Sequence, residues 1–225
     1  AHTGFTSVYT VDSDGDLQET YLPFMGDGWT TQDLSGTGGA GLPGTRKVLP
    51  GTAPVTVVHD GYTCVFTIDA GDSTHAKGDL QQTYLPYIGS RWYTWDLSTA
   101  LSVPASKVTP AVVYHDGNTS VYTVDGSNGN LWETYQTGVA TNYWTSQNLS
   151  ANYNTPPVDA FTSPTAVYHD GYTSVYTVDT TNAADGSTLG DLQETYLPNI
   201  GVGWNTQHLS VKYQVPLVNI LTSPT

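Results

Sequence analysis

The sequence is poor in cysteine and in basic residues, and both shortages exclude whole classes of protein. A single cysteine, Cys64, rules out an internal disulfide. Lysine and arginine number 6 against 20 acidic residues, which gives a net charge of −14. We therefore expect no nucleic-acid partner and no insertion into a membrane, because phosphate-rich surfaces need basic side chains to neutralise them. The sequence also contains no apolar run of about 18 residues, the length of a transmembrane helix.

Charged residues make up only 12% of the chain, whereas tyrosine occurs 16 times. Few charges with many Thr, Ser, Tyr, Asn and Gly are typical of secreted bacterial and fungal proteins, so we expect an extracellular location. The sequence begins with alanine and shows no signal sequence, which suggests a processed mature chain or an excised domain.

One segment occurs four times in the chain. Its copies occupy residues 2–12, 59–69, 115–125 and 169–179, and the fourth reads His-Asp-Gly-Tyr-Thr-Ser-Val-Tyr-Thr-Val-Asp. Cys64 stands where the other copies have serine. A period of 54 to 57 residues indicates stacked or ring-arranged units, because one such unit cannot bury its own apolar face.

Each repeat predicts four short antiparallel strands and no helix. The first strand is a β-branched or aromatic run opened by proline, as at Pro54, and a His-Asp-Gly-Tyr turn follows it. Asp-Gly between two such runs predicts a tight hairpin, since glycine accepts the positive φ that the turn needs. The second strand is Ser-Val-Tyr-Thr-Val-Asp, the third begins at positions such as Asp16, and the fourth opens with tryptophan.

Four antiparallel strands in about 50 residues are typical of a propeller blade. We therefore predict an all-β fold, a β-propeller of four four-stranded antiparallel blades in a single domain. The repeats cover approximately residues 1–52, 53–108, 109–162 and 163–225. Residues 222–225 match residues 162–165, which precede a first strand, so the two ends would meet in one blade. A ring of eight blades formed by a homodimer, or an incomplete piece of a longer protein, is the alternative.

Propeller strands run outwards from the axis in chain order, so the His-Asp-Gly-Tyr turn and the loop before the tryptophan share one face. Repeated aromatic and polar groups on one face suit sugars, which offer C–H patches and hydroxyl groups. The candidate ligand-binding residues are His59, Asp60, Tyr62, His115, Asp116, Asn118, His169, Asp170, Tyr172, Trp29, Trp92, Trp144 and Trp204. Two alternatives stay open: the tryptophans form the core between blades, and Asp-Gly only makes the turn.

Two metal hypotheses accompany this interpretation, although no cofactor is our main expectation. Four histidines at one phase near a ring axis could bind a transition metal, since imidazole suits Zn, Cu or Ni. The segment Asp12-Ser13-Asp14-Gly15-Asp16 is rich in oxygen ligands for calcium, but the other repeats do not keep its spacing. A polar hairpin loop explains that segment more simply.

The sequence offers little evidence of catalysis. Glu19, Glu133 and Glu194 recur at one position, where the second repeat has Gln82. No phosphate-binding loop and no set of nucleophile, base and orienting residue is present. Paired carboxylates for glycoside hydrolysis need one pocket with unlike environments, which a symmetric repeat does not predict. We therefore expect that the chain is not an enzyme and has no catalytic residues.

The repeated glycine-containing turns, the one tryptophan per repeat and the x-Leu-x-x-Thr-Tyr strands resemble the β-propeller lectins of the tachylectin and tectonin type. The resemblance covers the whole chain as architecture and implies a carbohydrate-binding protein. Our main prediction is a secreted, multivalent lectin that binds carbohydrate or glycoconjugate surfaces. The alternatives are a secreted propeller glycosidase or lyase, and a metal-binding or cell-wall-targeting interaction module.

Overall fold

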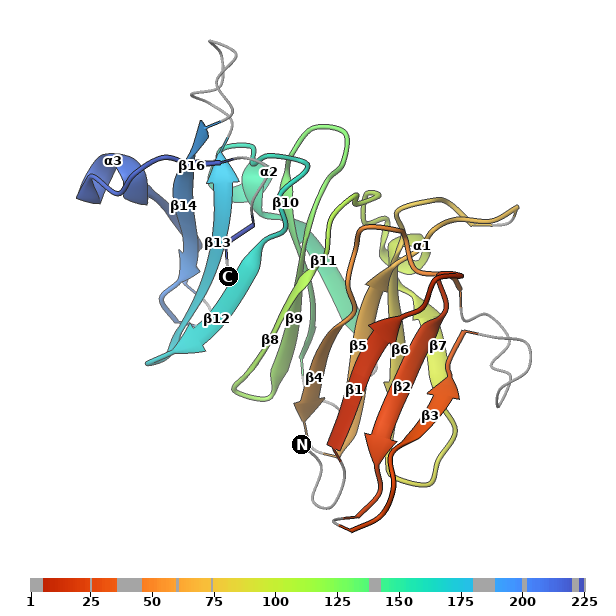
Figure 1. Cartoon of the computed structure of the whole chain (residues 1–225). Helices are drawn as coiled ribbons and strands as arrows, with labels where there is room; N and C mark the ends of the chain where they lie inside the picture. The colour runs from red at the N-terminus through yellow and green to blue at the C-terminus, as the bar shows by residue number, and fades with distance from the viewer. Residues whose placement is uncertain are drawn as a thin grey trace.

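The computed structural model describes residues 6–24, 26–35, 46–59, 61–73, 75–137, 143–179, 189–199, 202–219 and 223–224. These residues form four antiparallel sheets, which we call blades 1 to 4 in chain order (Figure 1). Blade 1 contains β1 (Thr6–Val11), β2 (Leu17–Leu22) and β3 (Thr30–Asp33). Blade 2 contains β4 (Val55–His59), β5 (Tyr62–Ile68), β6 (Leu80–Leu85) and β7 (Tyr93–Asp96).

Blades 3 and 4 repeat the same order of strands. Blade 3 contains β8 (Ala111–His115), β9 (Asn118–Val124), β10 (Leu131–Thr137) and β11 (Trp144–Asn148). Blade 4 contains β12 (Thr165–His169), β13 (Tyr172–Asp179), β14 (Leu189–Leu197) and β15 (Asn205–His208), and β16 (Val218–Asn219) pairs with β14. Apart from β16, each strand pairs with its chain neighbours within the same blade, so the predicted all-β, blade-like organisation is confirmed.

The Asp-Gly turns have the geometry that their sequence predicts. In blade 3, His115 pairs with Asn118, which leaves a two-residue loop between β8 and β9. Asp116 and Gly117 in that loop have φ of 48° and 82°. Two positive φ angles define a type I′ turn, whose twist matches that of the flanking strands. The turn directs His115 and Asn118 to the same end of the blade.

Three helices of five residues each differ from the sequence prediction. They are α1 (Leu97–Leu101), α2 (Leu149–Tyr153) and α3 (Leu209–Tyr213), and each follows the last strand of a blade. The Asp96 carboxylate accepts a hydrogen bond from the Thr99 N–H at 2.8 Å, and Asn148 caps α2 in the same way. A side-chain cap stabilises a single helical turn, but one turn is too short to show a helical period in the sequence. None of the helices in the described residues has the length and apolar character needed to cross a membrane.

Tryptophans at the start of the outermost strands hold successive blades together. Trp92, Trp144 and Trp204 are buried, and each ring meets an aromatic ring of the preceding blade edge-to-face. The partners are Tyr9, Phe66 and Tyr122, with ring centroids 5.8 to 6.0 Å apart. Edge-to-face aromatic pairs add to the free energy gained by burying both rings. The apolar core of this protein therefore lies between the blades.

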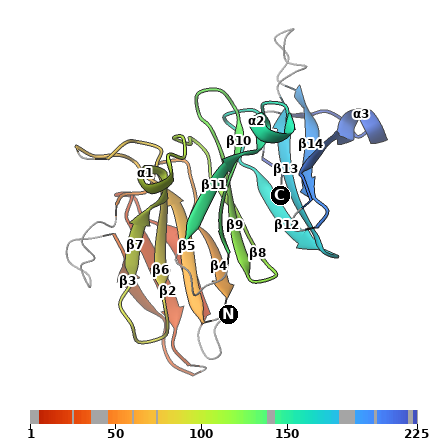
Figure 2. The same cartoon turned by 180° about the vertical axis from the view of Figure 1, so that it is seen from behind.

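The four blades form an open, curved row in this structure. Blades 1 and 4 lie at opposite ends of the row in both views (Figures 1 and 2). The closed ring of four blades that the matching chain ends predict is therefore not formed. Repeat phase fixes which strand belongs to which blade, but the angle between blades depends on side-chain packing that the phase does not specify.

We expect Trp144→Ala to lower the free energy of unfolding by roughly 3–5 kcal/mol, because it leaves a cavity between blades 2 and 3. Its neighbour Tyr143 is exposed, so Tyr143→Ala should change that free energy by less than about 0.5 kcal/mol. Urea denaturation followed by circular dichroism measures both values. Equal effects of the two substitutions would show that the tryptophan does not carry the packing between blades.

Candidate functional site

Three blades carry the same row of hydrogen-bonded side chains across their strands. In blade 3, Glu133 on β10 lies opposite Tyr122 on β9 and Gln147 on β11. The Tyr122 hydroxyl donates to one carboxylate oxygen at 3.2 Å, and Gln147 Nε2 donates to the other at 2.6 Å. Blades 1 and 4 have the equivalent rows Tyr9, Glu19, Gln32 and Tyr176, Glu194, Gln207. We call this arrangement the Tyr–Glu–Gln row.

The row of blade 3 lines a pocket of about 310 Å³ between blades 3 and 4, which we call the 3/4 pocket. Blade 3 contributes Glu133 and Gln147 as well as His115 and Asn118 from its first hairpin. Blade 4 contributes the loop before β15, which ends at Trp204. The hairpin and the tryptophan loop therefore meet on one face, as the strand order predicted. A pocket of this volume with an aromatic wall and several polar groups suits one sugar-sized ligand.

The pKa values of two groups in the 3/4 pocket, Glu133 and His115, are shifted in opposite directions. Burial raises the pKa of Glu133 above its ordinary value, although hydrogen bonds from Gln147, Ser120, Tyr122 and Trp204 act in the opposite direction. Burial also lowers the pKa of His115, and the nearby Asp116 carboxylate offsets part of this effect. Burial in the pocket thus disfavours the charged forms of both groups, a carboxylate for Glu133 and an imidazolium for His115.

A second pocket of about 310 Å³ lies between blades 1 and 2 and is built in the same way. Glu19, Tyr21 and Gln32 of blade 1 line it, together with Trp92 of blade 2. Arg91 precedes Trp92 here, whereas Gly203 precedes Trp204 in the 3/4 pocket. The two pockets therefore share a wall of aromatic and polar groups but differ in charge at the rim.

The equivalent space between blades 2 and 3 is closed. Its volume is only about 10 Å³. Gln82 replaces the glutamate of the row, and Trp95 replaces the glutamine and fills the space with its ring. The Gln82 amide donates to the Cys64 sulfur at 3.3 Å, and burial raises the pKa of that thiol to about 11. Cys64, Gln82 and Trp95 therefore line a closed space in this repeat, and Phe66 stands in place of the tyrosine of the row.

The histidines of the repeated turn pack between blades. His59 stacks on Tyr114 of blade 3 with ring centroids 4.7 Å apart, and His115 stacks on Tyr168 of blade 4 at 5.1 Å. Both histidines are buried. His115 also lines the 3/4 pocket, while His59 and Tyr62 border the closed one. Two histidines of the turn that we predicted as a ligand-binding site thus contribute to the contact between first strands.

The remaining predicted site residues lie at dispersed positions. Asp116 and Asp170 occupy exposed hairpin tips, and the Asp116 carboxylate accepts a hydrogen bond from the Tyr168 hydroxyl at 2.6 Å. His169 and Tyr172 are exposed at the tip of blade 4, where their rings stack. Asp60 lies outside the described residues.

The predicted tryptophans fall into two groups. Trp92 and Trp204 line the two open pockets, and Trp144 borders the closed one. Trp29 of blade 1 is exposed and lines neither kind of space. The structure therefore brings His115, Asn118 and Trp204 together in one pocket and does not unite the rest of the predicted residues there.

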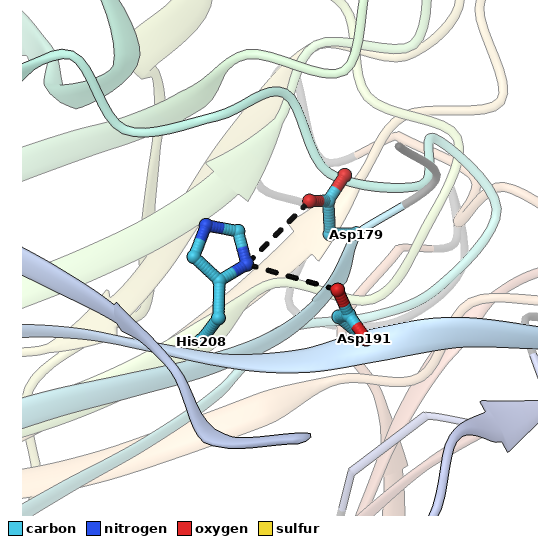
Figure 3. A group of neighbouring side chains, drawn as sticks. All are labelled: Asp179, Asp191 and His208. Carbon is cyan, nitrogen blue, oxygen red and sulfur yellow. Dashed lines mark ion pairs between the residues drawn. The ribbon is translucent and has the colours of Figure 1, made fainter. Parts of the chain in front are cut away.

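A carboxylate cluster lies at the opposite ends of the strands, where β13 ends and β14 and β15 meet. The His208 Nδ1 atom is 3.8 Å from an Asp179 oxygen and 3.9 Å from an Asp191 oxygen (Figure 3). It is the one group of three ligand-type side chains within 4.8 Å that the described part of the chain contains. It includes none of the repeated turn histidines, and His2 lies outside that part.

Blade 2 has carboxylates in a similar position, and there an arginine side chain pairs with them. There the Arg46 guanidinium pairs with Asp69 at 2.9 Å and with Asp96 at 3.0 Å, so a side chain supplies the cation. In the Asp12 loop, the Asp12 carboxylate accepts hydrogen bonds from the N–H groups of Asp14 and Asp16 at 2.9 Å each. These carboxylates stabilise strand ends and loops, and the metal hypotheses stay predictions.

Sequence reasoning missed the Tyr–Glu–Gln row as a site. It noted the recurring glutamates but gave them no role. The signal was present: tyrosine in the second strand, glutamate in the third and glutamine in the fourth recur in three of four repeats. Only the antiparallel register shows that the three side chains are cross-strand neighbours on one face.

No protein-family model matches the chain, and no curated protein sequence is similar to it. Solved structures do share its fold. A Bacteroides ovatus protein described as "Xyloglucan PUL GH43B" aligns with a TM-score of 0.52 and 12% identity, covering 92% of this chain and 39% of that one. The exo-β-1,3-galactanase of Phanerochaete chrysosporium with β-1,3-galactotriose has a TM-score of 0.50 and 10% identity, covering 92% and 49%.

A third structure belongs to the same group. The α-L-arabinanase of Penicillium chrysogenum with arabinobiose aligns with a TM-score of 0.50 and 13% identity, covering 89% of this chain and 57% of that one. The chain therefore spans less than two thirds of the length of these three structures. At such identities the likeness shows a shared β-propeller architecture.

These comparisons correct two of our predictions. We expected a non-catalytic lectin of the tachylectin or tectonin type. The structures of similar fold are instead glycoside hydrolases, which contradicts the lectin prediction and the expectation that the chain is not an enzyme. They agree with the alternative, a propeller glycosidase. The lectin resemblance rested on turns and tryptophans that position blades, and such residues are common to propellers of any function.

The raised pKa of Glu133 predicts a pH dependence of stability. A group whose pKa is higher in the folded state stabilises the fold below its ordinary value of 4.5 and loses this contribution as the pH rises through the folded-state pKa. We therefore expect the free energy of unfolding of the wild type to fall relative to that of Glu133→Gln as the pH rises above about 4.5. Urea denaturation across that range measures the difference. Parallel profiles of the two proteins would contradict the raised pKa.

Proposed function

We propose that the chain hydrolyses glycosidic bonds and that the 3/4 pocket holds the sugar next to the bond cleaved. One observation carries the proposal: Glu133 is a buried carboxyl with a raised pKa on the wall of a sugar-sized pocket. Because burial raises its pKa, this carboxyl keeps its proton to a higher pH than a free glutamate and can donate it to a leaving oxygen. The fold that the chain shares with glycoside hydrolases supports the same class of reaction.

The pocket offers a role to each group in such a reaction. Trp204 and Tyr153 provide aromatic surface for the C–H face of a sugar, and Asn118 offers hydrogen bonds to hydroxyl groups. Glu133 donates its proton to the glycosidic oxygen as the bond to the anomeric carbon breaks. A water then bonds to that carbon and gives its proton to the neutral imidazole of His115. This assignment uses one carboxyl and one imidazole where most glycosidases use two carboxyls.

Several finer points belong to the proposal. The galactanase and the arabinanase make β-1,3-galactan and arabinan the first polysaccharides to test. A secreted location, the absence of a cofactor, the single domain and the division into four repeats stay predictions. The number of blades in the working ring is also a proposal, and we favour eight blades from two copies for the reasons given in the next subsection.

We expect the wild type to release new reducing ends from at least one member of a panel containing arabinan, β-1,3-galactan and xyloglucan. Glu133→Gln should lower kcat by about 10²- to 10⁴-fold, the usual contribution of a general acid, with little change in substrate affinity. Chromatography of the released sugars gives kcat, and calorimetry with the uncleaved substrate gives affinity.

Glu19→Gln is the matched control, because it makes the same change in an equivalent row in the pocket between blades 1 and 2. This variant should keep the activity of the 3/4 pocket. Binding of a polysaccharide by the wild type without any cleavage would contradict the proposal. Equal loss of activity in both variants would contradict the assignment to Glu133.

A further inference from the structure

Successive blades meet at three contacts, and at each contact the later blade contributes one valine and one tryptophan at equivalent positions. Val65, Val121 and Val175 occupy equivalent positions and are fully buried at 0% exposure. Trp92, Trp144 and Trp204 are 6–7% exposed. In the contact between blades 3 and 4, Val175 and Trp204 pack in one cluster with Tyr122. At all three contacts, the preceding blade therefore covers the valine and the tryptophan of the later blade.

Blade 1 carries the same pair, but in the described part of the chain both side chains are largely exposed. Its equivalents Val8 and Trp29 are 49% and 55% exposed. The glycine before the tryptophan differs in the same way. A Cβ at Gly203 would lie 3.3 Å from the Tyr153 ring of the preceding blade, whereas one at Gly28 would meet nothing within 4 Å. We call this surface, defined by Val8, Gly28 and Trp29, the head face.

Blade 4 carries the complementary surface, which contains an open hollow of about 330 Å³. Tyr176, Val178, Leu192 and Val218 line this hollow, as do Ser223 and Pro224 near the end of the chain. Val178 is buried, and the other three apolar residues are half-buried. Their equivalents in blade 3 are buried beneath Val175 and Trp204. Tyr213 of α3, the equivalent of the tyrosine that covers Gly203, is 58% exposed. We call this surface, defined by Tyr176, Val178, Leu192, Val218 and Tyr213, the tail face.

We propose that the head face of one copy of the chain docks on the tail face of a second copy. Trp29 then meets Tyr176 as the internal tryptophans meet Tyr9, Phe66 and Tyr122. Gly28 lies beneath Tyr213 as Gly203 lies beneath Tyr153. Each copy has one head and one tail, so two copies make two identical contacts and close on themselves with twofold symmetry. The internal contacts identify the occupant, because each face matches a surface that this chain already packs three times.

The docked pair also completes a binding site at each junction. Glu194 of blade 4 accepts hydrogen bonds from Ser174, at 2.7 Å, and from Tyr176 and Gln207. This is the row that lines the open pockets, and it lacks only the tryptophan wall of a following blade. Trp29 of the second copy supplies that wall. The proposal concerns assembly and does not rest on the proposed hydrolysis.

Sedimentation velocity at micromolar concentration tests the assembly. We expect a mass of two chains for the wild type. Trp29→Glu on the head face and Tyr213→Lys on the tail face should each raise the dissociation constant by about 30-fold or more, as for a central aromatic residue of an interface. Tyr143→Glu, an equally drastic change at an exposed tyrosine of blade 3, should leave the dimer intact. Circular dichroism verifies that each variant folds, since the replaced side chains are exposed.

A mixing experiment distinguishes head-to-tail docking from other dimers. A Trp29→Glu chain keeps an intact tail, and a Tyr213→Lys chain keeps an intact head. Their equimolar mixture should therefore form a mixed dimer through one native contact, although each variant alone is monomeric. In a head-to-head or tail-to-tail dimer, by contrast, mixing the two variants would not restore a dimer with a native contact between them.

Three outcomes would overturn the proposal. The first is a wild type that stays monomeric at concentrations well above micromolar. In that case another part of a longer chain would cover the head face and the tail face. The second is a dimer that survives both substitutions. The third is a series of larger polymers in place of a dimer, because head-to-tail contacts that fail to close produce filaments.

Discussion

The packing of one tryptophan against an aromatic ring of the preceding blade is the interaction on which this molecule depends. No blade buries both of its sides alone, and each internal junction closes when Trp92, Trp144 or Trp204 enters it. The same ring forms a wall of the space next to the Tyr–Glu–Gln row. Stability and the candidate site therefore share residues, which is why a change at these tryptophans affects both.

Comparison of the junctions shows how one repeat loses a site while keeping its fold. The junction of blades 2 and 3 holds Gln82, Trp95 and Cys64 in place of glutamate, glutamine and serine, and its space is closed. Burying a carboxyl costs free energy unless several donors satisfy it, whereas an indole buries apolar surface directly. Blade 2 thus buries apolar surface at this position, while blades 1 and 3 have a hydrogen-bonded polar row that lines a pocket.

Because each blade buries its apolar sides against a neighbouring blade, apolar side chains are more exposed at the two ends of the row of blades. The surfaces that pack against each other at the three internal junctions are more open at the two ends of the described chain, where Trp29 is exposed in blade 1 and a hollow lies beside Tyr176 in blade 4. Apolar surfaces of this kind on a soluble protein usually mark an interface. The net charge of −14 opposes non-specific association of copies, so a contact between them calls for apolar faces such as these.

The sequence by itself determined the strands, their order in each blade and the tight Asp-Gly turns, because these depend on local alternation and on the backbone freedom of glycine. It also located the tryptophans and offered a place in the core between blades as one of their two roles, which Trp92, Trp144 and Trp204 have in the structure. Tertiary structure alone decided that Glu133 is buried and faces a pocket, that His59 and His115 stack between blades, and that the ring stays open. Each of these depends on side chains from two blades, and the angle and distance between blades arise from packing that no single repeat encodes.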